Sequence, residues 1–420
     1  GMTTSYVLGT LEKLGINQQM HRIKDYKSAA EMVMRKDMSP TVRENRNWML
    51  DGYWELYCEA LEEDRGITEE KIVALMEKAL IPIEVAVEEG FIDGVKYWDE
   101  VETVLLGEGK EKLQTVGQAR YAEEKPGDLG LKGKKKIAVI HAQGTIGGRK
   151  NRVDPLLGIM MGHETIVAEL KKAEKDDDIA AIVFRVDSPG GEGLASDLIG
   201  HQVEVTAKVK PVVVSMVDVA GSGGYHISYR ATRIVADEHT VTGSIGSISG
   251  KMNIAGLHDK IGMSHDFVTR GPHALFYSEY RDFTEDEWKI FTEDHWRGFN
   301  DWLRDVQEHR GIETFEEAEK LAHGRIFTGR QGAENGLVDE TGDLVRAVEV
   351  AKELAEIDAD EKVTVEHYPK QRGFFEELVG GNLTAVARYT IFRFRRGDLQ
   401  ETWESLSGPG VMMMEDIEID

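Results

Sequence analysis

A single serine lies in a sequence context that suits nucleophilic catalysis. Ser222 stands in the segment DVAGSGGYHIS (218–228), between glycines and directly after an apolar run that indicates a β-strand. A serine hydroxyl is a weak nucleophile until a neighbouring base removes its proton, so the segment supplies one half of a catalytic pair. Serine is also a common helix cap, and the turn alone therefore leaves catalysis and capping open.

Two glycine turns follow strands in this part of the chain, DSPGGEG (187–193) and AGSGG (220–224). Glycine lets backbone amides come close to a ligand, and a helix that begins near Ser222 would direct unpaired amides at a bound carbonyl oxygen. Ala220 stands where the nucleophile elbow of α/β-hydrolases requires glycine, so that fold is not indicated. His226 follows Ser222 by four residues, with no clear route to the serine oxygen.

The search for a base leads to an internal duplication. The segment 36–67 aligns without gaps to 281–312 at an offset of 245 residues, and both segments end in RGI. Two shorter matches, LEKLGI with HDKIGM and GFID with GLVD, keep nearly the same offset. The period is far too long for a solenoid, so the pattern predicts two similar tandem domains. The first copy of Ser222 would precede residue 1, and we expect the chain to begin inside its first repeat.

One copy carries a lysine that the other copy lacks. Lys27 lies in RIKDYKSAAEMVMRKDMSP (22–40), and the counterpart segment TRGPHALFYSEYRDFTE (269–285) contains no lysine. The base would therefore come from one repeat and the serine from the other. A lysine is almost wholly protonated at pH 7 unless burial lowers its pKa. The competing interpretation of Lys27 is a solvated lysine in a polar loop.

The residues around Ser222 alternate between strand and helix patterns, which predicts an α/β domain. A longer helix is expected from about Thr284 to His309, and its aromatic residues are interpreted as core. The expected strands are 136–146, 180–188, 211–219 and 232–237, and the expected helices are 163–175, 193–205 and a helix from about Ser222.

A proline, three glycines and a charge cluster in 117–136 mark a domain boundary. The expected parts are the end of the first repeat (1–125), a linker (126–136), the second repeat (137–358) and a C-terminal extension of unknown role (359–420). The extension contains the basic aromatic run FRFRR (392–396), which could touch a membrane surface, although a solvated edge or tail is the simpler interpretation.

Composition narrows the class of partner. The 76 acidic and 51 basic residues give a formal net charge of -25, which argues against a nucleic-acid backbone or an anionic membrane surface as the main partner. The one cysteine, Cys58, excludes an internal disulfide framework and a cysteine-rich metal site, and is expected in the core. No stretch of the chain approaches the roughly 20 apolar residues that cross a bilayer.

Several segments together resemble bacterial signal peptide peptidase A of the long form, a serine–lysine peptidase family with two tandem repeats. The resemblance covers nearly all of residues 1–358. Its motifs in this sequence are DYKSAAE, RVDSPGG, KPVVVSM, AGSGGYHIS, TGSIGSI and TGRQGAENGLVDETG.

The resemblance implies a role for each site residue. It implies that Ser222 is the nucleophile and Lys27 the general base, with Ser244 as a hydroxyl that orients the lysine. It also implies that the amides of Gly191 and Gly223 form the oxyanion hole, and that no metal or cofactor takes part.

The resemblance further implies a ClpP/crotonase-type α/β fold of repeated ββα units, in tandem domains of which the first is truncated. Peptide substrates such as cleaved signal peptides are expected, as is a homo-oligomeric ring with no nucleic-acid partner. Family members lie at the inner membrane with the catalytic part outside the cytoplasm, and the anchor that holds them there is expected upstream of this chain.

Two rival functions stay open. A crotonase-like enzyme would bind a thioester with the same glycine-turn amides, and Ser222 would then be dispensable. An inactive scaffold or binding module would follow if the truncated first repeat had lost its active geometry. Trapping by a serine-directed acylating probe would discriminate against the scaffold.

Overall fold

The computed structural model describes residues 2–106, 113–117, 120–121, 132–154 and 158–369. The chain divides into two compact units, a main unit of residues 1–95 with 133–366 and a second unit of residues 96–132 with 367–420. Helix α6 (Trp98–Leu106) belongs to the second unit. The FRFRR run and most of the predicted linker lie outside the described residues.

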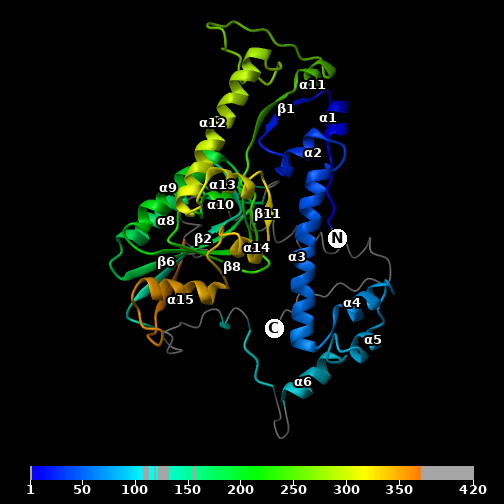
Figure 1. The fold of residues 1–420 in the computed structure, drawn as a ribbon, viewed down its shortest axis with the longest axis vertical. Coiled ribbons are helices and arrows are strands. Elements are labelled where there is room, and N and C mark those ends of the chain that lie inside the picture. Colours follow the sequence, from blue (N-terminus) through cyan, green and yellow to red (C-terminus); the bar gives the residue numbers. More distant parts are fainter. Residues whose placement is uncertain (1, 107–112, 118–119, 122–131, 155–157, 370–420) are drawn as a thin grey trace. The chain divides into compact units, whose positions relative to one another are not determined.

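An eight-stranded sheet forms the centre of the main unit (Figure 1). Its strand order is β11-β9-β7-β6-β2-β13, with β8 paired to β7 and β12 paired to β8. Strands β2, β6, β7, β8 and β9 run parallel. The strands are β2 (Lys136–Gln143), β6 (Ile179–Ser188), β7 (Val212–Gly221), β8 (Arg233–Ala236), β9 (Val241–Gly243), β11 (Ile326–Phe327), β12 (Glu340–Thr341) and β13 (Thr364–Tyr368).

Helices cover both faces of this sheet, as near-continuous apolar strands require. Helices α8 (His163–Lys175) and α9 (Gly193–Ala207) lie on one face, and α15 (Leu344–Leu354) lies on the other (Figure 1). The predicted strand–helix alternation and the α/β class are confirmed, and α8 has the predicted bounds.

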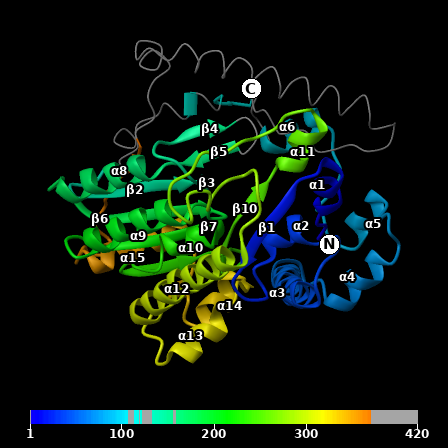
Figure 2. The same cartoon turned by 90° about the horizontal axis from the view of Figure 1, so that it is seen from above.

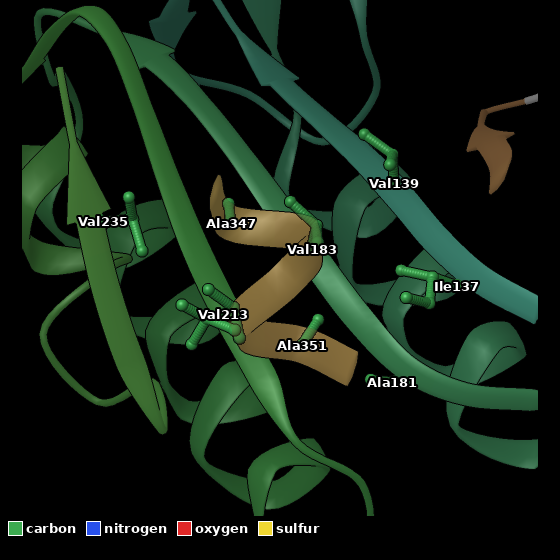
Figure 3. Packing of buried hydrophobic residues seen from close by; sticks show 9 residues of the cluster. Ile137, Val139, Ala181, Val183, Val213, Val235, Ala347 and Ala351 are labelled. Carbon is green, nitrogen blue, oxygen red and sulfur yellow. The ribbon is translucent and has the colours of Figure 1, made fainter. Parts of the chain in front are cut away.

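The core beneath α15 is made of small and β-branched side chains from four neighbouring strands (Figure 3). Ile137 and Val139 of β2 and Val183 of β6 are fully buried there against Ala347 and Ala351 of α15. The two alanines let the helix approach the sheet closely, because a larger side chain would hold it away. This packing holds β6 and β7 in place, and the two glycine turns follow the carboxyl ends of these strands.

Two smaller sheets complete the strands of the main unit. The antiparallel pair β1 (Asn17–Arg22) and β10 (Ile248–Asn253) joins the N-terminal segment to the strand that follows β9 in the sequence (Figures 1 and 2). The other sheet has the order β3-β5-β4 and consists of β3 (Thr145–Ile146), β4 (Arg152–Asp154) and β5 (Gly158–Met161).

Two long helices begin with similar N-terminal caps and are followed by similar glycines. Helix α3 (Pro40–Arg65) is capped by the Ser39 side chain, and α12 (Glu285–His309) is capped by Thr284, 245 residues further on. Gly66 and Gly311, which follow these helices, have φ values of 64° and 63°. Equal caps are what a duplication predicts, and the duplication itself stays a prediction. The predicted helix over 284–309 is confirmed.

The remaining helices are short and connect these parts. They are α1 (Leu8–Leu14), the 3-10 helix η1 (Ser28–Ala30), α2 (Glu31–Met34), α4 (Glu69–Met76), α5 (Ile83–Glu88), α10 (Gly223–His226), α11 (Ala255–Lys260), α13 (Phe315–Leu321) and α14 (Gly329–Glu334). Cys58 of α3 is buried, as predicted. Within the described residues, no helix combines the length and the apolar character that a bilayer span requires.

Candidate active site

Strand pairing brings two predicted site residues side by side. The last residues of β7 and β9 are partners, Gly221 opposite Gly243, so Ser222 and Ser244 emerge together at the same edge. The Ser222 amide donates to the Gly243 carbonyl at 2.9 Å. Both serines have positive φ values, 54° and 52°, which are uncommon for residues other than glycine and concentrate at functional sites.

The Ser222 hydroxyl is not used as a helix cap. Ser222 is the N-cap residue of α10, yet its side chain makes no capping hydrogen bond. The alternative that the glycine turn left open, a structural serine at a helix start, is therefore not what the structure has. The hydroxyl faces another partner instead.

That partner is Lys27, and the pairing of β1 with β10 positions the segment that contains it. Arg22 pairs with Ile248, and the Ile23 amide continues the ladder by donating to the Ser247 carbonyl at 2.8 Å. The chain that follows β1 therefore runs alongside the chain that precedes β10, and Lys27 arrives beside Ser244.

Three hydrogen-bond distances surround the Lys27 amine. Its Nζ lies 2.8 Å from Ser222 Oγ, 2.7 Å from the Ser244 carbonyl oxygen and 2.9 Å from Ser244 Oγ. A neutral amine has two N–H donors and one lone pair. The two donors can point at the two Ser244 oxygens, which leaves the lone pair to accept the Ser222 hydroxyl proton.

Burial tunes this amine for base chemistry. The Lys27 residue is 6% exposed, and desolvation lowers the pKa of its amine from 10.5 to about 7. Desolvation is the only cause of the lowered pKa, and among the described residues no carboxylate forms an ion pair with Lys27. A large share of the Lys27 side chains is therefore neutral near pH 7.

The glycine turn after β6 lies directly against the turn after β7. Gly190 has a φ of 98°, and a Cβ atom built on it would lie 2.5 Å from the Gly223 nitrogen and 2.8 Å from Ser222 Cβ. A Cβ atom on Gly223 would lie 3.0 Å from the Gly191 nitrogen. Only glycine permits this approach, which gathers the Gly191 and Gly223 amides next to the serine.

Both of these amides are available to a ligand. Gly223 is the first residue of α10, where an amide has no acceptor within its helix. Within the described part of the chain, neither Gly191 nor Gly223 donates its amide to a backbone carbonyl. Two unpaired N–H groups beside a serine hydroxyl are what an oxyanion hole requires.

A cleft of about 1170 Å³ opens onto these groups and is lined by all five predicted site residues. Helix α12, which passes beside α10 in both views, supplies one of its walls (Figures 1 and 2). Phe291 and Phe299 are buried, as the sequence predicted for the aromatic residues of this helix, whereas Trp288, Trp296 and Trp302 are only partly buried. Phe291, Phe299 and Trp302 line the cleft. In the part of the chain that the structure describes, no three His, Cys, Asp or Glu side chains are grouped to hold a metal ion.

His226 lines the same cleft and takes other partners. Its ring stacks on Trp302, with centroids 4.9 Å apart and an interplanar angle of 13°. Its Nε2 atom lies 3.6 Å from Asp197 Oδ1, and burial is the main cause that lowers the pKa of the imidazole. This geometry agrees with the sequence-based argument that His226 has no route to the serine oxygen.

Sequence reasoning missed a chain of polar contacts beside the lysine. His21 Nδ1 lies 2.8 Å from His295 Nδ1, and His295 Nε2 lies 2.7 Å from Ser247 Oγ. Burial lowers the pKa of His295 to about 4, with a smaller contribution from His21. These contacts tie β1, α12 and the segment before β10 together, and they keep the Lys27 segment next to Ser244.

The profile of peptidase family S49 matches residues 1–111 and 204–358. The chain belongs to peptidase family S49. The matched segments contain Lys27, Ser222 and Ser244, whereas Gly191 lies between them. The resemblance drawn from the sequence motifs is confirmed.

Known proteins of similar sequence carry protease names. The chain is 33% identical over 383 residues to the chloroplastic serine protease SPPA of Arabidopsis thaliana, which covers 90% of this chain and 56% of that protein. It is 31% identical over 364 residues to protease 4 of Haemophilus influenzae, covering 83% of this chain and 58% of the relative. The chain thus spans little more than half the length of these two relatives.

A solved structure is also similar, at lower identity. A mutant of the membrane-bound stomatin-specific protease 1510-N aligns with 57% of this chain and 99% of its own, at 13% identity and a TM-score of 0.35.

Proposed function

We propose that this chain cleaves peptide bonds, with Ser222 as the nucleophile and Lys27 as its general base. One observation carries the proposal: a buried lysine, with no carboxylate partner among the described residues, places its amine 2.8 Å from the hydroxyl of a serine whose side chain makes no capping hydrogen bond. Burying a lysine without an ion-pair partner lowers the stability of the fold, so a lysine in this position is best explained by a function.

Acylation would begin with attack of Ser222 Oγ on the carbonyl carbon of the scissile bond. As the O–C bond forms, the hydroxyl proton passes to the neutral Lys27 amine. The two contacts to Ser244 hold the amine so that its lone pair faces the serine. The Lys27 ammonium then returns the proton to the departing amine, and the acyl group stays on the serine as an ester.

Charge on the carbonyl oxygen would develop next to the glycine turns. Among the residues that the structure describes, the Gly191 and Gly223 amides have no backbone acceptor, so they can donate to that oxygen in the tetrahedral intermediate. Such amides stabilise the transition state more than the substrate, because they are already aligned when the charge forms. Water, deprotonated by Lys27, would then release the acyl group by the reverse steps.

The substrates we propose are small, largely apolar peptide segments such as cleaved signal peptides. The aromatic residues on the α12 wall offer apolar surface to such segments. Homo-oligomeric rings, and a location at the inner membrane with the catalytic part outside the cytoplasm, are proposed from the family resemblance. Sedimentation of the purified chain tests the oligomer.

A crotonase-like thioester enzyme is the main rival among enzymes. It would need the two glycine amides, but neither the Ser222 hydroxyl nor a lysine in contact with it. The observed Lys27–Ser222 contact therefore favours the peptidase over this rival.

The test is hydrolysis of a fluorogenic apolar peptide ester between pH 6 and pH 10. Four proteins are compared: wild type, Ser222→Ala, Lys27→Ala and the matched control Lys24→Ala. Lys24 lies in the same segment but forms a partly exposed pair with Glu319, so its removal leaves the rate within about twofold of wild type. Loss of activity in Ser222→Ala and in Lys27→Ala supports the dyad. An active Lys27→Ala enzyme would mean that another group is the base.

A further inference from the structure

Helix α12 presents a regular stripe of residues to the cleft. Phe291, Asp294, Gly298, Trp302 and Asp305 line it at spacings of three and four residues. At about 100° per residue, these five positions share one face of the helix. Gly298 lies at the centre of that face and is the one member of the stripe without a side chain.

The fold itself gives no reason for glycine at this position. Gly298 lies within a regular helix, and a Cβ atom built on it would meet nothing within 4 Å. Gly52 of α3 is a useful contrast, because its Cβ would lie 2.9 Å from Gln331 Nε2 and 3.2 Å from Thr328 Cγ2. Glycine inside a helix is less favourable than alanine. Gly52 is therefore explained by packing, and Gly298 is not.

Two contacts place Gly298 opposite the catalytic pair. Three residues before it, His295 binds Ser247, which belongs to the segment that holds the lysine amine. Four residues after it, Trp302 stacks on His226, which ends the short helix that begins at the nucleophile. The open space over Gly298 therefore lies across the cleft from the reacting groups.

The carboxylates of α12 near this space are paired, and the partner of Asp305 is Arg230, which lies outside the helix. Asp294 pairs with Arg297, and Asp301 pairs with Arg304 at 3.1 Å. Of the two stripe residues one turn from Gly298, Trp302 offers an aromatic side chain and Asp294 is the acid already paired with Arg297, while Phe291 lies about one turn beyond Asp294. The chemistry of the space therefore suits a large apolar or aromatic group rather than a cation.

We propose that Gly298 determines specificity by leaving room on the α12 wall for one large apolar or aromatic side chain of the peptide. This inference rests on the proposed peptidase function and adds to it a subsite with a size preference. A side chain that enters the space loses its contact with water against the aromatic groups, and that burial favours large residues over glycine.

The test measures peptide binding separately from catalysis. A heptapeptide panel, in which phenylalanine replaces glycine at each position in turn, is titrated by fluorescence anisotropy against the Ser222→Ala protein. We expect one position at which phenylalanine tightens binding by about tenfold or more. Adding Gly298→Leu removes this preference, whereas Gly298→Ala keeps most of it and raises the unfolding temperature.

The matched control is Lys289→Leu, which adds a leucine to the opposite side of α12 at a position whose side chain is 75% exposed. We expect Lys289→Leu to leave the peptide affinities unchanged. If Gly298→Leu leaves the peptide affinities unchanged, or changes them equally at every position, the proposed subsite is wrong. Hydrolysis by the corresponding proteins with Ser222 intact separates this outcome from failure of the proposed function, since binding does not require the serine.

Discussion

Replacing Lys27 by methionine is expected to stabilise the protein at neutral pH while it abolishes activity. Lys27 has a pKa of about 7 in the folded protein and about 10.5 when it is unfolded and solvated. The folded state therefore binds fewer protons between these pH values, and stability rises with pH across this window. Below about pH 7 the buried lysine costs its full amount, and above about pH 10.5 it costs nothing.

The magnitude follows from the same two pKa values. At about 1.4 kcal/mol per pH unit, the fall from 10.5 to about 7 corresponds to about 5 kcal/mol of lost stability at low pH. Methionine removes this cost but also gives up the hydrogen bonds to Ser244, worth about 1 to 2 kcal/mol. We expect Lys27→Met to be about 3 kcal/mol more stable than wild type at pH 7, and no more stable at pH 10.5.

Urea unfolding followed by tryptophan fluorescence at pH 6, 7 and 10.5 measures this difference. Lys24→Met is the control, because Lys24 is paired with Glu319 near the surface and changes stability by less than about 1 kcal/mol at any of these pH values. A Lys27→Met protein that is less stable than wild type at pH 7, or whose gain does not shrink as the pH rises, would refute the reasoning.

Three further substitutions test other parts of the site. Ser244→Ala removes a contact of 2.9 Å from the lysine amine and leaves the carbonyl contact, so kcat/KM should fall about tenfold; an unchanged value would show that the hydroxyl does not orient the base. Gly190→Ala would push a Cβ atom to 2.5 Å from the Gly223 nitrogen, and kcat/KM should fall by about 100-fold or more while circular dichroism shows a folded protein; retained activity would count against an oxyanion hole here. Glu31→Gln weakens the pair between the buried Glu31 and the partly exposed Arg22, which ends β1, and should cost about 2 kcal/mol in urea unfolding; a loss below about 0.5 kcal/mol would mean that the pair adds no stability.

Local patterns in the sequence were sufficient for most of the elements and for selecting the two residues that we propose to react. The 13-residue helix α8 begins and ends where its apolar spacing and its flanking residues predicted. Lys27 could be singled out because one repeat has a lysine where the other has none. These features are encoded within short segments, or by comparing two segments of one chain.

Features that depend on contacts between distant segments could not be predicted in this way. The His21–His295 contact joins residues 274 positions apart, and nothing in either local sequence signals it. The positive φ of Ser244 is equally hidden, because a serine carries no preference for that conformation. The lowered pKa of Lys27 arises from burial by several elements at once, so it too requires the folded chain.

The most direct test of the account is the pH dependence of Ser222 acylation. A serine-directed fluorophosphonate is reacted with the wild-type chain between pH 5 and pH 10, and mass spectrometry locates the label. If neutral Lys27 is the base, the label lies on Ser222, and the acylation rate rises with pH through a single ionisation near 7 before it levels off. A rate that keeps rising towards pH 10, or a label on another residue, would contradict the Ser222–Lys27 pair.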